Sequence, residues 1–303
     1  MGEIIGLIGV GLMGSAMSGQ FIEAGYEVQG YDIDARRLNE LEECGGRAVS
    51  SPGAAAEGAG QVVLSLMTSD VIREVCFGPG GLTEAKPEGL LVIDTSTSRP
   101  EDSIANAADL REWGIAFVDA SLSGSSPMIR TKNIVAMVGG EKADFERAKP
   151  LLDTIARSVY HLGPNGAGAR TKLIVNLILG LNRVAVAEGL CLGMKSGMDM
   201  EILLTVLKDS FAYSKAMENR GERMIKADYD DPMSRLFQHH KDVGLMLEQG
   251  QDLGSPMPLT SALKQILVSA EANGQRDWDT SSIIEVFRRG AGIPSRQPPG
   301  GEA

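Results

Sequence analysis

A glycine-rich segment near the N-terminus constrains the fold of this chain more than any other feature. The apolar run 4–8 is followed directly by Gly9-Val-Gly11-Leu-Met-Gly14, a GxGxxG pattern between a strand signal and a helix signal. Gly9 permits a tight turn, Gly11 lets a ligand approach the backbone, and Gly14 lets the helix pack on the sheet. Because the first N–H groups of such a helix attract anions, the segment predicts binding of a dinucleotide pyrophosphate.

A carboxylate follows the second predicted strand, 27–31, about 20 residues beyond the glycines. Asp32 stands where a side chain hydrogen-bonds the ribose hydroxyls of a dinucleotide, and its charge repels a 2′-phosphate, which favours NAD. Arg36 and Arg37 come soon after, and an arginine there is able to bind that phosphate, so NADP remains an alternative. We favour the simpler interpretation that both arginines lie on a solvated helix face.

The first half of the chain alternates short apolar runs with amphipathic stretches. This alternation is typical of βαβ units and predicts a mainly parallel sheet covered by helices on both faces. The predicted strands are residues 4–8, 27–31, 61–67, 90–94, 116–119 and 134–138, and the first two predicted helices are residues 14–24 and 35–43.

The second half of the chain contains almost only helix signals. The longest predicted helix covers residues 167–196 and is apolar on most sides. Shorter helices are predicted at 200–208, 214–225, 236–251, 258–273 and 281–288. We therefore expect an α/β fold with an N-terminal Rossmann dinucleotide-binding domain over residues 1–164, an all-helical domain over 165–291 entered through a long interdomain helix, and a flexible tail rich in Pro and Gly over 292–303.

Composition narrows the classes of partner. The chain of 303 residues has a formal net charge of −11 and 43% hydrophobic residues, which disfavours nucleic acid and anionic membranes as partners. The three cysteines are widely spaced and indicate free thiols in a reducing compartment. The apolar run 173–181 is too short to span a bilayer, and no targeting segment is visible, so we expect a cytoplasmic protein. The three histidines form no ligand cluster, and no metal site is predicted. For His239 and His240 a surface position is favoured over contact with the substrate.

A second chemical signal opens the long helix. Three glycines between residues 163 and 168 precede Lys172, and Asn176 follows at a spacing of four, so both side chains share one helix face. The residues around them are apolar. A lysine in this setting either extends its amine to solvent at the helix end or points into a cleft as a proton carrier, and the spacing leaves both possibilities open.

The Lys172 segment and five further motifs in the same order resemble those of the β-hydroxyacid dehydrogenase family, which includes 3-hydroxyisobutyrate dehydrogenase, tartronate semialdehyde reductase and L-threonate dehydrogenase. The resemblance covers about residues 4–290. Besides the glycine segment and the Lys172 segment, the matching motifs are Ile93-Asp-Thr-Ser-Thr97, Asp119-Ala-Ser-Leu-Ser-Gly-Ser125, Lys241-Asp-Val-Gly-Leu245 and Pro256-Met-Pro-Leu-Thr260.

The resemblance implies a role for each matching position. Lys172 would exchange a proton with the substrate hydroxyl or carbonyl, and Asn176 would orient the substrate. Ser123 and Gly124 would hold the substrate carboxylate, with Ser125 beside them. The expected cofactor residues are Gly9, Gly11, Leu12, Met13, Gly14, Asp32, Leu66, Met67, Thr97 and Lys241.

Three of these positions have simpler alternatives. Ser123-Gly124 is compatible with an ordinary turn, and Lys241-Asp242 with a solvated pair on a helix. Thr97 is compatible with a helix cap, because Pro100 and Glu101 follow it.

The sequence also departs from the family pattern. The substrate motif usually reads Asp-Ala-Pro-Val-Ser-Gly-Gly, but here Ser121 replaces the proline and Ser125 replaces the last glycine. Val175 stands where Asn is frequent, and Ser234 where Phe is frequent. These changes retain the expected chemistry and leave the identity of the substrate open.

The resemblance therefore implies an oxidoreductase that transfers a hydride between NAD(P) and the hydroxyl-bearing carbon of a short β-hydroxy acid. An imine reductase is the alternative enzyme, although Lys172 disfavours it, and a non-catalytic dinucleotide sensor is the alternative from another class. The long apolar helix offers more hydrophobic surface than one small domain needs, so we expect a homodimer or homotetramer.

Overall fold

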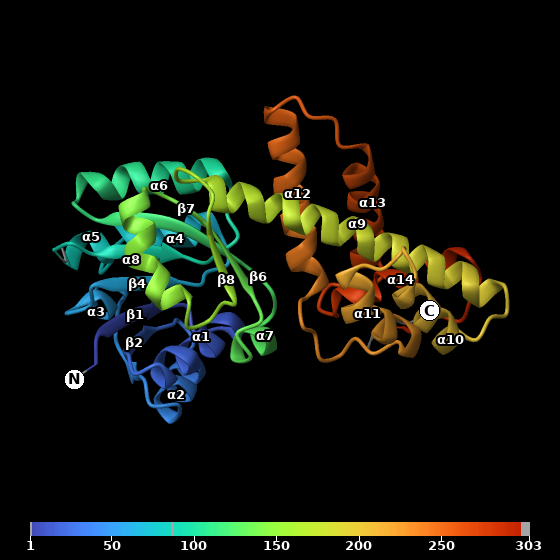
Figure 1. Ribbon diagram of the computed structural model, residues 1–303, viewed down its shortest axis with the longest axis horizontal. Helices are drawn as coiled ribbons and strands as arrows, with labels where there is room; N and C mark the ends of the chain where they lie inside the picture. The colour runs from blue at the N-terminus through green and yellow to red at the C-terminus, as the bar shows by residue number, and fades with distance from the viewer. Residues whose placement is uncertain (1, 86–87, 298–303) are drawn as a thin grey trace. The chain divides into compact units, whose positions relative to one another are not determined.

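The computed structural model describes residues 2–85 and 88–297 (Figure 1). The chain divides into two compact units, Met1–Lys172 and Leu173–Ala303, which we describe one at a time. Of the expected tail over 292–303, residues 298–303 lie outside the described part of the chain.

The first unit is built on an eight-stranded sheet (Figure 1). The order of the strands is β3-β2-β1-β4-β5-β6-β7-β8, in which only the β6–β7 pair is antiparallel. Their bounds are β1 Ile4–Ile8, β2 Glu27–Tyr31, β3 Arg47–Ala48, β4 Gln61–Leu64, β5 Leu91–Asp94, β6 Ala116–Ser123, β7 Val135–Gly139 and β8 Ser158–His161. The order of the first six is that of a dinucleotide-binding sheet, with its reversal between β1 and β4.

Helices cover both faces of this sheet, and alternating strand residues explain why. Val63 and Ile93 belong to one buried cluster, while their neighbours Val62 and Val92 belong to another. Successive side chains of a strand point to opposite faces, so both faces are buried and the strands read as continuous apolar runs. The helices are α1 Leu12–Glu23, α2 Ala35–Glu43, α3 Pro52–Ala56, α4 Ser69–Phe77, α5 Leu82–Ala85, α6 Pro100–Glu112, α7 Ser126–Arg130 and α8 Lys142–Leu152.

The sheet differs from the sequence prediction at its far end. Strand β6 was expected to end at Asp119 but continues to Ser123, because it pairs over residues 119–123 with the antiparallel β7. Strands β3 and β8 were not predicted. Both are short edge strands, and β8 includes exposed polar positions, so neither shows the apolar run used to identify the others.

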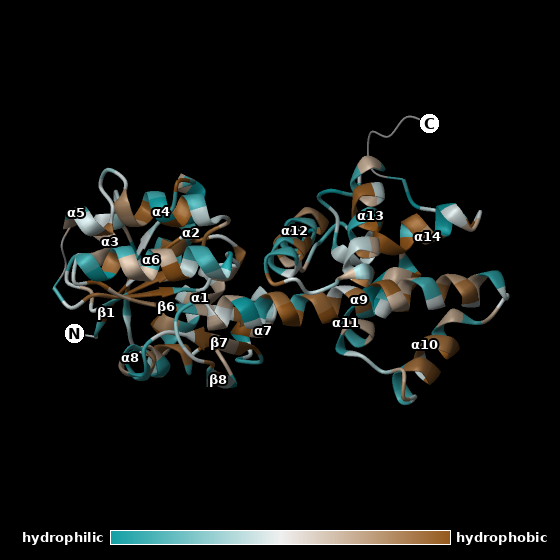
Figure 2. Ribbon diagram, turned by 90° about the horizontal axis from the view of Figure 1, so that it is seen from above, coloured by the Kyte–Doolittle hydropathy of each residue, from teal (hydrophilic) through white to brown (hydrophobic). Residues whose placement is uncertain are grey.

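The second unit is all helical. Helix α9 (Ala167–Lys195) leads into it from the first unit. It is followed by α10 Met200–Asp209, α11 Lys215–Lys226, α12 Leu236–Asp252, α13 Pro258–Ala272, the short 3-10 helix η1 Thr280–Ile283 and α14 Ile284–Gly290. Figure 2 shows apolar residues along several of these helices, and the buried core is formed by residues such as Leu190, Tyr229 and Ile284.

Helix α9 has the length and composition of a membrane span, with a mean hydropathy of 1.6 in its most apolar window. One such helix is weak evidence, because long apolar helices of soluble proteins pass the same test. Only 28% of that window is buried within the described residues, so much of its apolar surface is exposed in the single chain.

Candidate active site

Five of the predicted motifs lie along one edge of the parallel sheet. The glycine segment follows β1, Asp32 follows β2, and residues 66–67 follow β4, while Thr97 follows β5 and residues 123–125 end β6. Strands β2, β1, β4, β5 and β6 are adjacent and parallel, so their carboxyl ends meet at the same edge. Ligands of open α/β sheets bind outside this edge, near the reversal of strand order.

The three glycines of the GxGxxG segment suit their positions for different structural reasons. Gly9 adopts a φ of 91°, and a Cβ there would collide with the carbonyl oxygen of Ser65. A Cβ on Gly14 would collide with the carbonyl oxygen of Gly9, so only glycine lets α1 start this close to the loop. Gly11 differs, since a Cβ there would meet no atom within 4 Å. That open space, at the N-terminus of a twelve-residue helix, fits a pyrophosphate.

Asp32 connects the second strand to the glycine segment. Its Oδ2 accepts a hydrogen bond from Val10 N at 2.7 Å, and its Oδ1 accepts one from Asp34 N at 2.9 Å. The carboxylate therefore has a defined position beside the start of α1, which suits contact with a ribose. Arg36 pairs with Asp34 at 2.8 Å, and Arg37 pairs with Glu40 at 2.7 Å.

The hydroxyl of Ser96 connects the loop after β4 to the loop after β5 through a hydrogen bond. Leu66 N donates to Oγ of Ser96 at 2.9 Å, and Ser96 N donates to Oδ1 of Asp94 at 2.9 Å. Asp94 is buried, and burial raises its pKa to about 6. The N-cap residue of α6 is Arg99 and not Thr97.

The end of β6 combines a glycine in an unusual conformation with an unpartnered hydroxyl. Gly124 has a φ of 152°, and a Cβ there would collide with the side chain of Ile134. Oγ of the buried Ser125 has no hydrogen-bond partner among the described residues. A buried hydroxyl without a partner is costly, and the carboxylate of a substrate would supply its acceptor. Ser123 is half-buried beside it.

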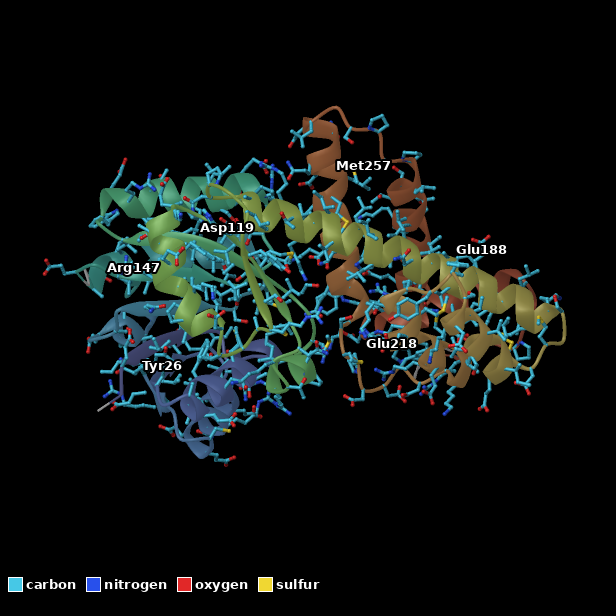
Figure 3. The ribbon with its side chains drawn as sticks, in the orientation of Figure 1. Tyr26, Asp119, Arg147, Glu188, Glu218 and Met257 are labelled. Carbon is cyan, nitrogen blue, oxygen red and sulfur yellow. The ribbon has the colours of Figure 1, made fainter. Side chains whose placement is uncertain are left out.

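Asp119 fastens the start of α9 to strand β6 (Figure 3). Its Oδ1 accepts from Gly166 N at 2.7 Å, and its Oδ2 accepts from Ala169 N at 2.8 Å. A Cβ at Gly168 would collide with the carbonyl oxygens of Asp119 and Met137, so the helix start lies directly against the sheet. Burial raises the pKa of Asp119 to about 6, while the two N–H donors lower it.

Lys172 reaches back to the same strand. Its Nζ donates to the carbonyl oxygen of Leu122 at 2.5 Å, next to Ser123 in the chain. Strand β6 therefore positions both the start of α9, through Asp119, and the tip of the lysine. The structure brings Lys172 and Ser123 to one place within the first unit, although they are 49 residues apart in sequence.

In the helical unit, Asn176 and the Lys-Asp motif are brought together. Asn176 Nδ2 donates to Oδ2 of Asp242 at 3.0 Å, and Lys241 Nζ lies 3.5 Å from Oδ1 of Asp242. Asp242 therefore joins the side-chain amide of Asn176 on α9 to the predicted cofactor lysine on α12. The expectation that His239 lies on the surface is wrong, because His239 is buried and packs against Gly180 of α9. His240 is half-buried and contacts Glu271 at 2.9 Å.

Sequence reasoning did not assign roles to several residues that shape the site. Asp119, Asp242 and Ser96 all lie within predicted motifs. The sequence around each of them does not indicate which backbone or side-chain groups it hydrogen-bonds. The available signal for Asp119 was a carboxylate at a strand end followed, later in the chain, by a glycine-rich helix start.

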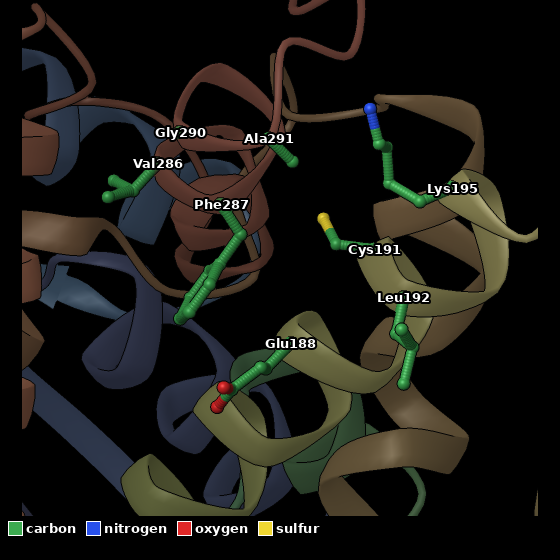
Figure 4. A pocket seen from close by; sticks show the side chains of 8 residues that line it. All are labelled: Glu188, Cys191, Leu192, Lys195, Val286, Phe287, Gly290 and Ala291. Atoms are coloured by element: carbon green, nitrogen blue, oxygen red, sulfur yellow. The ribbon is translucent and has the colours of Figure 1, made fainter.

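A shallow hollow of about 400 Å³ lies between α9 and α14 in the helical unit (Figure 4). Its lining is mainly apolar, with Glu188 and Lys195 as charged members. None of the predicted site residues lines it.

Comparison with known families agrees with this geometry. Residues 4–163 match the model of the NAD binding domain of 6-phosphogluconate dehydrogenase, and residues 166–287 match the NAD-binding domain of NADP-dependent 3-hydroxyisobutyrate dehydrogenase. The chain is 32% identical to 2-(hydroxymethyl)glutarate dehydrogenase of Eubacterium barkeri, over 95% of this chain and 96% of the relative. The chain belongs to the β-hydroxyacid dehydrogenase family. As a member, it is an NAD(P)-dependent oxidoreductase of small hydroxy acids or their semialdehydes.

Solved structures agree with membership of this family. The 3-hydroxyisobutyrate dehydrogenase of Salmonella typhimurium superimposes with a TM-score of 0.86 at 28% identity, covering 94% of this chain and all of that one. The Streptomyces aurantiacus imine reductase shares the fold, but with a TM-score of 0.64 at 20% identity, covering 94% of this chain and 99% of that one. The β-hydroxyacid dehydrogenase structure is therefore the nearer of the two.

Proposed function

We propose that this β-hydroxyacid dehydrogenase oxidises a short β-hydroxy acid with NAD, and reduces the matching semialdehyde, with Lys172 as the proton acceptor and donor. The observation that supports this assignment best is the contact of Lys172 Nζ with the carbonyl oxygen of Leu122. It holds the amine at the residue that precedes Ser123 in the chain, where the segment proposed to bind the substrate carboxylate begins. An acid anchored there would present its neighbouring hydroxyl to the amine.

Each residue would then have one task. Ser123, the N–H of Gly124 and the unpartnered Oγ of Ser125 would bind the carboxylate, with Asn176 orienting the substrate. Lys172 in its neutral form would remove the hydroxyl proton during oxidation, and its ammonium form would return a proton during reduction. When bound, the nicotinamide supplies the hydride acceptor or donor. Asp119 would keep Lys172 in place by holding the start of α9.

The proposed cofactor contacts follow the carboxyl edge of the sheet. The glycine segment with Leu12 and Met13 would bind the pyrophosphate, and Asp32 the ribose. Leu66, Met67, Thr97 and Lys241 would contact the nicotinamide half. We propose NAD over NADP, because Asp32 would repel a 2′-phosphate and because Arg36 and Arg37 both pair with neighbouring carboxylates.

A spectrophotometric screen tests this proposal. Purified protein would be assayed with NAD and NADP in parallel against a panel of short β-hydroxy acids, following the appearance of reduced nicotinamide. We expect turnover with NAD on at least one acid. Turnover of a cyclic imine and of no hydroxy acid would contradict the proposal. Cofactor binding without any turnover would instead support a sensor.

We also propose that the enzyme is a cytoplasmic homodimer or homotetramer, with domains at 1–164 and 165–291. Exposed apolar side chains on α9 and α10 support the assembly, among them Leu192, 70% exposed, and Ile202, 64% exposed. Light scattering coupled to size exclusion should give a mass at least twice that of one chain, and an Ile202→Glu variant should lower it. A wild-type monomer would contradict the assembly.

A further inference from the structure

Arg183 is an arginine inside an apolar helix, and its guanidinium has an unusual environment. It lies on α9 in the helical unit. Its Nε and Nη1 have almost no solvent-exposed surface, and neither atom has a hydrogen-bond partner among the described residues. Burying a charge without a partner is strongly unfavourable. Arg288 in the same unit shows the usual solution, because its Nη1 donates to Glu285 Oε1 at 2.9 Å and its Nη2 to the Met224 carbonyl oxygen at 2.9 Å.

The charges around Arg183 do not balance. Its pKa is lowered to about 10, first by burial and then by the nearby Arg220, while the carboxylate of Asp279 acts in the opposite direction. Asp279 already pairs with two other arginines, because Arg220 Nε lies 3.1 Å from its Oδ1 and Arg223 Nη1 lies 3.6 Å from its Oδ2. Arg223 also pairs with the exposed Asp228, with its Nε 3.4 Å from Oδ2. Three guanidinium groups therefore share one buried carboxylate and one exposed carboxylate.

Asp279 also accepts hydrogen bonds from several uncharged donors. Its Oδ1 accepts from Ser281 N and Ser281 Oγ, at 2.9 and 2.7 Å, and its Oδ2 accepts from Met233 N at 2.9 Å. Its acceptor sites are thus occupied by the fold of the helical unit itself. A water molecule near Arg183 would supply an acceptor oxygen but no negative charge. The cluster lacks an anion.

Within the helical unit, Arg183 and Asn176 lie on the same face of α9. Arg183 follows Asn176 by seven residues on α9, which is about two helical turns or roughly 10 Å along the same face. Gly180 lies between them on that face, and a Cβ there would be 2.6 Å from Nε2 of His239. The face of α9 that carries Asn176 thus also carries Gly180, against which the buried His239 packs, and Arg183.

One of the departures from the family pattern lies in this cluster. Ser234 stands where the family frequently has Phe, and its Oγ lies 3.5 Å from Nη2 of Arg220 and 3.2 Å from Oγ1 of Thr280. A phenylalanine there would place a ring against these polar atoms. The small hydroxyl instead leaves the position polar beside the arginines, so the substitution and the unbalanced charge favour the same kind of ligand.

We propose that Arg183, with Arg220 and Ser234 beside it, binds the second carboxylate of a hydroxy dicarboxylate substrate. This inference rests on the proposed function and narrows its substrate class from β-hydroxy acids in general to those with a further acidic group. The planar guanidinium presents paired donors that match a carboxylate, and the negative charge would balance the cluster. Arg183 is thus a specificity-determining residue that takes no part in the proton transfer.

The decisive experiment compares two acids that differ only in the second carboxylate: 2-(hydroxymethyl)glutarate and 2-(hydroxymethyl)pentanoate. We expect wild-type kcat/KM to be higher for the dicarboxylate by about tenfold or more. Arg183→Met should lower kcat/KM for the dicarboxylate by about 30-fold or more and change the monocarboxylate value by less than about threefold. Arg276→Met is the matched control, because Arg276 is exposed and pairs with Glu271; it should leave both values unchanged.

Binding is measured independently of turnover. Glutarate should raise the thermal unfolding midpoint of the wild-type protein, and the rise should vanish in Arg183→Met, with butyrate at equal ionic strength as the reference ligand. Where Arg183→Met fails to fold, Arg183→Lys replaces it. The lysine keeps the charge but loses the two-pronged contact, so the dicarboxylate preference should fall only in part.

The outcomes separate this inference from the proposed function. Equal loss on both acids, or no loss on the dicarboxylate, would overturn the role of Arg183. Protection by sulfate equal to that by glutarate would also overturn it, since the site would then hold a separate inorganic anion. If the wild-type protein oxidises neither acid, the panel of short β-hydroxy acids decides the proposed function, while Arg183-dependent protection by glutarate would still establish the carboxylate site.

Discussion

The two units of this molecule build their parts of the site by different means. In the first unit the backbone dominates: a tight glycine turn, an open space at Gly11, and loops at the carboxyl ends of five adjacent strands. In the helical unit the candidate ligand-binding groups are side chains from different helices. Asn176 hydrogen-bonds Asp242, and the charges of Arg183 and Arg220 repel each other. The first arrangement suits a cofactor common to many substrates, and the second can change with a few substitutions.

The difference suggests how this family separates chemistry from specificity. The glycine turn tolerates little change, because a Cβ on Gly9 or Gly14 would collide with backbone atoms. The helical unit tolerates exchanges such as the serine at 234, whose neighbours are the side chains of Arg220 and Thr280. Three changes in the first unit and one further test of its buried carboxylates would break or sharpen this contrast.

The largest expected effect concerns Lys172, the lysine that we propose transfers the proton. Lys172→Ala should lower kcat by about 10²- to 10⁴-fold, because the proposed general acid–base group is removed. The Kd for NAD should change by less than about threefold, since the cofactor contacts remain on other segments. Steady-state kinetics and a titration of NAD binding measure the two quantities. Turnover at the wild-type rate would remove Lys172 from the mechanism.

The glycines offer a matched pair within one motif. Gly14→Ala places a methyl group against the carbonyl oxygen of Gly9, so the free energy of unfolding should fall by about 1–3 kcal/mol. Gly11→Ala meets no atom within 4 Å, so stability should change little while NAD binding weakens. Chemical denaturation and cofactor titration of both variants are the measurements. Equal loss of stability in the two variants would show that the space at Gly11 is not reserved for a ligand.

The smallest expected effect, taken for one carboxyl group and one pH unit, is a dependence of stability on pH. Burial raises the pKa of Asp94 and of Asp119 to about 6, above the value of an exposed carboxyl. Between about pH 4 and 6 the folded state therefore binds more protons than the unfolded state, so the free energy of unfolding should decrease as pH rises, by on the order of 1 kcal/mol for each group and each pH unit.

Asp119→Asn separates the contributions of these two carboxyl groups. The variant should show a smaller decrease, because only Asp94 then contributes, and its kcat should fall because the start of α9 loses an acceptor. Denaturant melts across this pH range test the first point. A decrease as steep as in the wild-type protein would assign it to other groups.

The sequence predicted those parts of the fold and site that depend on local backbone conformation. The strand, glycine turn and helix over residues 4–23 and the carboxylate at Asp32 were predicted in place, because a GxGxxG turn requires glycine at fixed positions and because buried parallel strands are continuous apolar runs. Lys172 was identified by its motif. The family followed from six motifs in order, and the comparisons confirmed it.

Tertiary structure decided what depends on contacts distant in sequence. The extension of β6 to Ser123 needed the antiparallel partner β7, and the position of Lys172 needed Asp119 and Leu122, about 50 residues earlier. The burial of His239 and the unbalanced charge around Arg183 had no local signal. The sequence by itself determined the cofactor turn and the type of chemistry, since these rest on local backbone geometry. Only folding decided which charges are buried together, because that depends on the packing of whole helices.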